Sequence, residues 1–295
     1  MAQTDLHMHS AVSADGEISP RGLAELCCQE RVTLAALTDH NDIAGTAEFI
    51  WRCAQLGVQA IAGVELDCMF EGNLLHVLGY GIDIANTALL HTVQTVYGIQ
   101  SEAGLRLMDA VSALGIAFNR EQVLEWAGDS AVCAETIAKS ALQVPENRTH
   151  PLIRPLLSGG ALADRPLVNF YWSICAPGKL AYVPVEFMAA GQAIDLIHAA
   201  GGIAVLAHPG ISISDTAVLD RVLRLPLDGM EAFSSYHTAQ QAVLYVQKAK
   251  EYGLLLTGGS DFHGRIKPDI RIGVVDWQGC ENEARAALLD AVSCV

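Results

Sequence analysis

Asp5-Leu6-His7-Met8-His9-Ser10 opens the chain with two histidines that are one residue apart. On an extended strand alternate side chains point to the same face, so His7 and His9 form a ready pair of metal ligands. We expect a strand over about residues 3 to 8 that ends in this pair. If other strands also end in ligands, the sheet must bring those ends together.

Other side chains suited to the same site arrive in separate stretches. Most follow short apolar runs of the kind that form buried strands. Glu65 lies inside such a run, where a carboxylate without a partner would be costly. A set of imidazoles and carboxylates without cysteine favours manganese, iron, zinc or magnesium over a thiolate zinc site. The candidate ligands are His7, His9, Asp15, His40, Glu65, His76, His208, Asp261 and His263.

Strand and helix patterns alternate along the chain. Helices are expected over residues 19–30, 44–56 and 187–200, and strands over 33–38, 58–66, 74–82, 203–207, 229–234 and 254–257. This alternation predicts an α/β fold with about seven parallel strands closed into a barrel. An open doubly wound sheet is the alternative. The barrel is preferred because a ring converges ligands from several strand ends on one point.

Residues 86–177 interrupt this alternation with mostly helical periodicity, in pieces over 86–114, 120–127, 133–142 and 150–158. We expect an inserted helical cap subdomain there, with the barrel formed by residues 1–85 and 178–295. Insertions on rigid α/β scaffolds commonly carry specificity. The cap is therefore expected to select the substrate.

Composition limits the partners. The formal net charge of −15 repels long polyanions such as duplex DNA, whereas metal ions would attract a small phosphate ester locally. The eight cysteines form no CxxC motif and are interpreted as reduced core thiols. Neither a signal peptide nor a membrane span is recognisable, so the cytoplasm is the expected location.

A few basic side chains are candidates for contacts with substrate phosphate, the alternative being ordinary surface charges. His237 follows a strand at the expected active face, and the others fall in or beside the cap. P-loop, dinucleotide-binding and nucleophile-elbow motifs are missing from the sequence. The candidates are Arg148, His150, Lys179 and His237.

The stretches DLHMHSAVSADG, ALTDHND, GVE, LAHPG and GSDFHG together resemble the PHP superfamily, named for polymerase and histidinol phosphatase. The resemblance covers residues 5–83 and 180–275. It implies a distorted (β/α)7 TIM-like barrel with a phosphoesterase centre of two or three divalent ions, manganese first, with iron, zinc and magnesium as alternatives. It further implies that His7, His9, Glu65 and Asp261 bind one ion, Asp15, His40 and His263 a second, and Glu65, His76 and His208 a third.

NRTHPLIRPLLSGG and GKLAYVP, at residues 147–160 and 178–184, are similar to a bacterial subgroup of the same family. That subgroup includes 3',5'-nucleoside bisphosphate phosphatases and 5'-3' exoribonucleases. The resemblance implies hydrolysis of the 3'-phosphate of a nucleoside 3',5'-bisphosphate such as adenosine 3',5'-bisphosphate. Trimming of short RNA oligonucleotides and another small-molecule phosphatase activity, such as histidinol phosphatase, are the alternatives. One departure is Ile211, near a position where a relative often carries arginine.

The expected mechanism is attack on the phosphomonoester by a metal-bound hydroxide. His208 and His237 are the candidates for the acid that protonates the leaving group. Amidohydrolases, which also begin with an HxH pair, are a rival class, but many need a carboxylated lysine, and Lys139 in the insertion is the only lysine before residue 179. A noncatalytic metal-binding domain is the other rival.

Overall fold

A nearly closed barrel forms the centre of the protein, whose computed structural model describes residues 3–293. Its strands follow the order β1-β2-β3-β4-β6-β7-β8, and β5 (Met188–Ala189) pairs with β3 outside this path. The main-chain N–H of Leu6 donates to Gly258 O at 3.2 Å and closes the ring between its first and last strands. The barrel prediction is confirmed. The strands are β1 (Thr4–Asp5), β2 (Leu34–Leu37), β3 (Gln59–Phe70), β4 (Asn73–Tyr80), β6 (Ile203–Leu206), β7 (Gly229–Ser234) and β8 (Leu255–Gly259).

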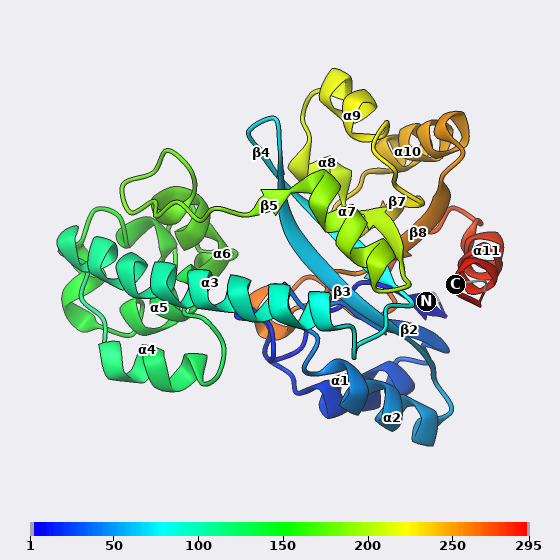
Figure 1. Ribbon diagram of the computed structural model, residues 1–295. Helices are drawn as coiled ribbons and strands as arrows, with labels where there is room; N and C mark the ends of the chain where they lie inside the picture. The colour runs from blue at the N-terminus through cyan, green and yellow to red at the C-terminus, as the bar shows by residue number, and fades with distance from the viewer. Residues whose placement is uncertain (1–2, 294–295) are drawn as a thin grey trace.

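Helices pack around the barrel (Figure 1). The Ser19 hydroxyl accepts the Gly22 N–H and caps the first helix, and Gly57, at φ 74°, ends the second in the left-handed conformation that glycine tolerates. Both helices begin and end close to the predicted limits. The barrel helices are α1 (Pro20–Gln29), α2 (Thr46–Leu56), α7 (Ala190–Ala199), α8 (Pro209–Ser212), α9 (Thr216–Val222), α10 (Ala239–Tyr252) and α11 (Glu281–Ser293), with the short 3-10 helix η4 (Gly264–Ile266).

The expectation of parallel strands throughout is wrong for β4, which runs antiparallel to both β3 and β6. Glu71 and Gly72, at φ 49° and 80°, form the two-residue connection between β3 and β4. Such a turn makes a hairpin, because a parallel crossover needs a dozen or more residues. The first strand is also shorter than expected, so His7 and His9 lie in the extended segment that follows β1.

Residues 86–177, called the cap below, are helical and lie to one side of the barrel (Figure 1). They have a hydrophobic core of their own that includes Met108, Ile137 and Phe170. Only a 3-10 turn forms within the predicted piece 150–158. The cap elements are α3 (Thr87–Ala113), α4 (Arg120–Ala127), α5 (Ala134–Ala141), η1 (Pro145–Thr149), η2 (Arg154–Leu156), α6 (Pro166–Phe170) and the π-helical turn η3 (Tyr171–Cys175).

Tyr80 lies in the barrel core and is fully buried, with its hydroxyl donating to Leu6 O at 2.9 Å. Disulfides do not link the cysteines of residues 3–293, and four of those cysteines are buried. A membrane-crossing helix is not found in the same range.

Candidate metal centre

All nine predicted ligands converge at one end of the barrel. Their candidate ligand atoms fall into overlapping groups, with the atoms of each group lying within 4.8 Å of one another. The fold brings these nine side chains together. Metal binding by them stays a prediction. Three groups consist of predicted ligands alone: His7, His9, Glu65 and Asp261; His9, Asp15, His40 and His263; and Glu65, His76 and His208. A fourth group joins His40 and His76 to Asp67, which was not predicted. Below, these nine residues are called the cluster.

The pairs His7-x-His9 and Asp261-x-His263 meet because barrel closure holds their two segments side by side. Asp261 N–H donates to His7 O at 2.8 Å, and His9 N–H donates to Phe262 O at 2.9 Å. Asp261 has φ 57°, a left-handed conformation that is uncommon outside glycine and turns its carboxylate inward. A Cβ on Gly259 would lie 2.3 Å from His7 Cβ, so only glycine allows this close approach.

Glu65 occupies the centre of the cluster and is fully buried. Its Oε2 lies 3.0 Å from His7 Nε2 and 3.1 Å from His9 Nε2. Its Oε1 lies 2.9 Å from His76 Nδ1 and 3.1 Å from His208 Nε2. His40 Nδ1 also lies 3.3 Å from Oε2, so each oxygen faces a different set of histidines, as a carboxylate that bridges two ions would.

Asp261 and Asp15 contribute the other carboxylates. Asp261 Oδ1 lies 3.0 Å from His9 Nε2, and Asp15 Oδ2 lies 3.0 Å from His263 Nε2. His40 Nε2 is 3.9 Å from the same Asp15 oxygen. The second group therefore opens toward solvent on the side of Asp15 and His40, which are both partly exposed.

The outward ring nitrogens of several cluster histidines have partners of their own. His7 Nδ1 lies 3.1 Å from Glu231 Oε1, His9 Nδ1 lies 3.2 Å from Ser13 Oγ, and His263 Nδ1 lies 2.8 Å from Asp261 O. Such contacts fix which nitrogen faces a metal. Sequence analysis missed Glu231, although it is a buried acid inside the apolar run of β7 and carries the same signal as Glu65.

The charges of the cluster shift the pKa values of neighbouring histidines in opposite directions. Burial opposes protonation of His40, but the carboxylates of Glu65 and Asp15 raise its pKa to about 10. Burial and the adjacent His263 and His40 lower the pKa of His9 to about 4. Burial also disfavours ionised Glu65, yet the surrounding histidines hold its pKa well below the usual value. Positive charge is needed among these carboxylates, and bound divalent cations would supply it.

The donor atoms are arranged as ligands of divalent metal ions, and several of them form no hydrogen bonds with one another. Buried atoms without a hydrogen-bond partner in residues 3–293 include His9 Nε2, His263 Nε2 and Asp261 Oδ1. Ligand atoms bound to one ion at about 2.1 Å lie about 3.0 to 3.4 Å apart in octahedral or tetrahedral geometry. The separations of 3.0 and 3.1 Å from His9 Nε2 to Asp261 Oδ1 and Glu65 Oε2 match that range.

Lys267 is a cation at the cluster that sequence analysis missed. Its Nζ lies 2.9 Å from Asp261 Oδ2 and 2.8 Å from the Tyr236 hydroxyl, which itself donates to the same Asp261 oxygen. Among residues 3–293 no other lysine or arginine forms an ion pair with a cluster member. Burial disfavours the charged ammonium, but Asp261 and Asp15 raise the pKa of Lys267 above its usual value.

The two histidines among the predicted phosphate contacts bind main-chain groups. The His237 ring uses both nitrogens on main-chain groups, Nδ1 donating to Ala232 O at 3.0 Å and Nε2 accepting from Gly210 N–H at 3.2 Å. His150 Nδ1 accepts from Leu152 N–H at 3.3 Å, and its Nε2 donates to Leu114 O at 3.0 Å.

Arg148 and Lys179 are exposed, and their side chains form no hydrogen bond within residues 3–293. Within residues 3–293 none of the four predicted phosphate contacts forms a hydrogen bond or ion pair with a side chain of the cluster, and their contact with phosphate stays a prediction. His208, the other candidate acid, turns its Nε2 toward Glu65 Oε1 as a ligand would.

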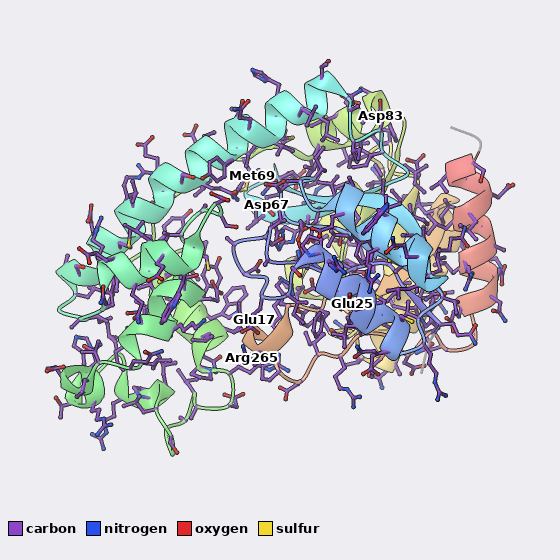
Figure 2. The ribbon with its side chains drawn as sticks, turned by 90° about the horizontal axis from the view of Figure 1, so that it is seen from below. Glu17, Glu25, Asp67, Met69, Asp83 and Arg265 are labelled. Carbon is purple, nitrogen blue, oxygen red and sulfur yellow. The ribbon has the colours of Figure 1, made fainter. Side chains whose placement is uncertain are left out.

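The cap contacts the barrel segments that follow the cluster residues. Ser130 Oγ donates to Val12 O at 2.9 Å, beside the loop that carries Asp15. Arg165 Nε lies 2.9 Å from Asp269 Oδ2, in the segment after His263 and Lys267. Glu17 and Arg265, side by side in Figure 2, join the same two barrel segments with Nη2 and Oε1 2.7 Å apart.

Comparisons with known proteins agree with this geometry. The PHP domain family matches residues 5–126. The chain is 30% identical to a 5'-3' exoribonuclease of Haemophilus influenzae, over 88% of this chain and 89% of the relative. It is 29% identical to a 3',5'-nucleoside bisphosphate phosphatase of Chromobacterium violaceum, over 89% and 88%.

A solved structure from Chromobacterium violaceum, described as an amidohydrolase with bound sulfate and no metal, superimposes with a TM-score of 0.78. The two chains are 26% identical, and the match covers 97% of this chain and 96% of that one. The shared architecture thus includes both the barrel and the cap.

Proposed function

This chain belongs to the PHP domain family of metal-dependent phosphoesterases, and on that premise we propose that it removes the 3'-phosphate from nucleoside 3',5'-bisphosphates. The observation that carries the proposal is the convergence of nine imidazole and carboxylate side chains, with Glu65 at their centre. The products would be a nucleoside 5'-monophosphate and inorganic phosphate. The relative from Chromobacterium violaceum named for this activity supports this choice of substrate.

The three groups of cluster residues would hold two or three divalent ions, with manganese proposed first. Ions bound there would bring the pKa of a coordinated water near neutrality and polarise the phosphoryl oxygens. The protein's own contribution is orientation. Glu231, Ser13 and the Asp261 carbonyl hold His7, His9 and His263 with one nitrogen facing inward.

Lys267 is the proposed protein cation for the substrate phosphate. An ammonium has three N–H donors, and Asp261 and Tyr236 account for two of them. The third can donate to a phosphoryl oxygen bound next to Asp261, in a charge-assisted hydrogen bond.

A 5'-3' exoribonuclease activity on short RNA is the second candidate, favoured by the 30% identical relative of that name. The two activities are separated by comparing kcat/KM for adenosine 3',5'-bisphosphate with kcat/KM for a short 5'-phosphorylated RNA in Mn²⁺. We expect the bisphosphate to be preferred. A preference for RNA of about 100-fold, equal to about 2.7 kcal/mol in transition-state stabilisation, would overturn the phosphatase proposal.

His7→Ala and Asp261→Asn test whether turnover depends on the cluster. Each removes a residue whose nitrogen or oxygen faces Glu65 or His9. We expect both variants to lose bound Mn²⁺ and phosphatase turnover together. Full turnover in both would show that the reaction occurs elsewhere.

A further inference from the structure

Asp67 is a buried carboxylate next to the cluster that the ligand prediction did not include. It lies two residues beyond Glu65 on β3, so both side chains point to the same face of the strand. The register places it directly opposite His76 on β4. Its residue is 8% exposed, and Figure 2 shows it where the cap meets the barrel.

One oxygen of Asp67 is anchored by amides. Asn41 Nδ2 donates to Oδ2 at 2.9 Å, and the Asp67 N–H donates back to Asn41 Oδ1 at 3.0 Å. Gln100 Nε2, on α3 of the cap, lies 3.5 Å from the same Oδ2. Because the N–H of Asp67 fixes which end of the Asn41 amide is the acceptor, Asn41 must present a donor to Oδ2. The carboxylate therefore cannot rotate freely.

The other oxygen, Oδ1, faces two histidines of different groups. It lies 3.3 Å from His40 Nδ1 and 3.4 Å from His76 Nε2, and it has no other partner in residues 3–293. The opposite nitrogens of these rings face ligand positions. His76 Nδ1 lies 2.9 Å from Glu65 Oε1, and His40 Nε2 lies on the side of Asp15.

This arrangement completes a pattern. His7, His9 and His263 each present one nitrogen to the cluster and hold the other on an outer oxygen. Among the described residues, Asp67 Oδ1 is the single oxygen that faces both His40 and His76; His40 Nδ1 also lies 3.3 Å from Glu65 Oε2. We propose that Asp67 is a positioning carboxylate shared by two metal positions, fixing the ring orientation and tautomer of both His40 and His76.

The proposal rests on the metal centre proposed above and adds a coupling between its second and third positions. An ion at either position would draw on the same oxygen to orient its histidine. Gln100 extends the contact to the cap.

Asp67→Asn tests the proposal at nearly constant volume. An amide cannot satisfy both sides, because the Asn41 donor requires its oxygen, and its NH2 would then face the ring N–H groups of His40 and His76. The apo protein is titrated with Mn²⁺ by calorimetry, and bound metal is counted at saturation. Asp83→Asn, an exposed position far from Asp67 in Figure 2, is the matched control.

We expect Asp67→Asn to weaken two Mn²⁺ binding steps by about 10- to 100-fold while the number of ions at saturation stays that of the wild type. One ion fewer at saturation, with the other affinities unchanged, would overturn the proposal in favour of Asp67 as a direct ligand. Unchanged affinities would also overturn it. A wild-type chain that binds no Mn²⁺ would overturn the metal centre itself.

Imidazole nitrogen chemical shifts of the diamagnetic Zn²⁺-loaded protein give a readout that a purely structural role would not move. The proposal predicts a proton on Nδ1 of His40 and on Nε2 of His76, both lost or shifted in Asp67→Asn, with His7 unaffected. Asn41→Asp is the second variant, since it removes the amide donor but leaves Asp67 in place. It should shift the same two rings; a shift spread over all cluster histidines would refute the specific role.

Discussion

In the proposed function, the Lys267 ammonium would link the metal centre to the substrate phosphate. Lys267→Met should raise KM for the bisphosphate and the inhibition constant of inorganic phosphate by about 10- to 100-fold, because a hydrogen bond to a charged group contributes about 1.5 to 3 kcal/mol. Steady-state kinetics with phosphate as inhibitor measures both constants.

The control for Lys267→Met is Lys250→Met, at an exposed position on α10. It should leave both constants unchanged. Bound Mn²⁺ must also be counted, because Lys267 contacts Asp261. Loss of metal without any change in phosphate inhibition would assign Lys267 to Asp261 alone.

The cysteine thiols differ in reactivity according to burial. Burial raises the pKa of Cys53 and of Cys175 to about 12, whereas Cys28 is exposed. At pH 8 a thiol of pKa 12 has about one part in ten thousand as reactive thiolate, and this fraction rises about tenfold per pH unit. Iodoacetamide at pH 8 should label Cys28 first, as followed by mass spectrometry of peptides. Equal labelling of Cys175 in the native protein would contradict its burial.

Residue types and spacing predicted which side chains would meet at the site but missed the partners that hold them. The nine ligands could be found because histidines and acids at strand ends are chemically conspicuous. Glu231 and Asp67 carried a usable signal, since each is an acid in an apolar strand. Lys267 and Tyr236 carried none, because their role depends on how the segment after His263 folds back over Asp261.

Among the elements, β8 shows most clearly how packing sets the site. Gly259→Ala would place a methyl group 2.4 Å from His7 N, so the barrel seam must open or His7 must move. Overpacking of this kind costs about 1 to 3 kcal/mol, and we expect lower stability together with weaker Mn²⁺ binding. Chemical denaturation and metal titration measure the two effects.

Gly98→Ala is the matched control for Gly259→Ala. Gly98 lies within α3 with open space around the position of a Cβ, so alanine should stabilise the protein by about 0.5 to 1 kcal/mol through helix propensity. Metal binding should not change. Equal destabilisation by both substitutions would show that the crowding at His7 is not the cause.

Element order was predictable, but strand direction was not predicted correctly for β4. Apolar runs and helix caps located most barrel elements, because each depends on local sequence. The hairpin at Glu71 and Gly72 had a local signal too, because the predicted strands 58–66 and 74–82 leave only residues 67–73 between them, too few for a parallel crossover. The pairing of Asp67 with His76 follows from that hairpin, so the error in direction also hid a contact of the site.

At the scale of the whole molecule, the net negative charge opposes binding of long anions, whereas the proposed metal centre would attract short ones. The chain has 18 lysines and arginines against 33 acids, a net charge of −15. Bound metal ions would, together with Lys267, concentrate positive charge in one place. A bisphosphate interacts mainly with that place, whereas a longer RNA also lies over acidic surface.

Local attraction by the metal centre and repulsion by the rest of the surface predict different salt effects on KM for the two substrates. Raising ionic strength from about 50 to 200 mM shortens the screening length and should raise KM for adenosine 3',5'-bisphosphate, because local attraction is weakened. For a short RNA, repulsion from the rest of the surface is screened as well, so its KM should rise less or fall. Proteins with a basic track for nucleic acid behave in the opposite way, losing affinity steeply with salt. A KM for RNA that rises more steeply than that for the bisphosphate would therefore contradict the repulsion and support the exoribonuclease alternative.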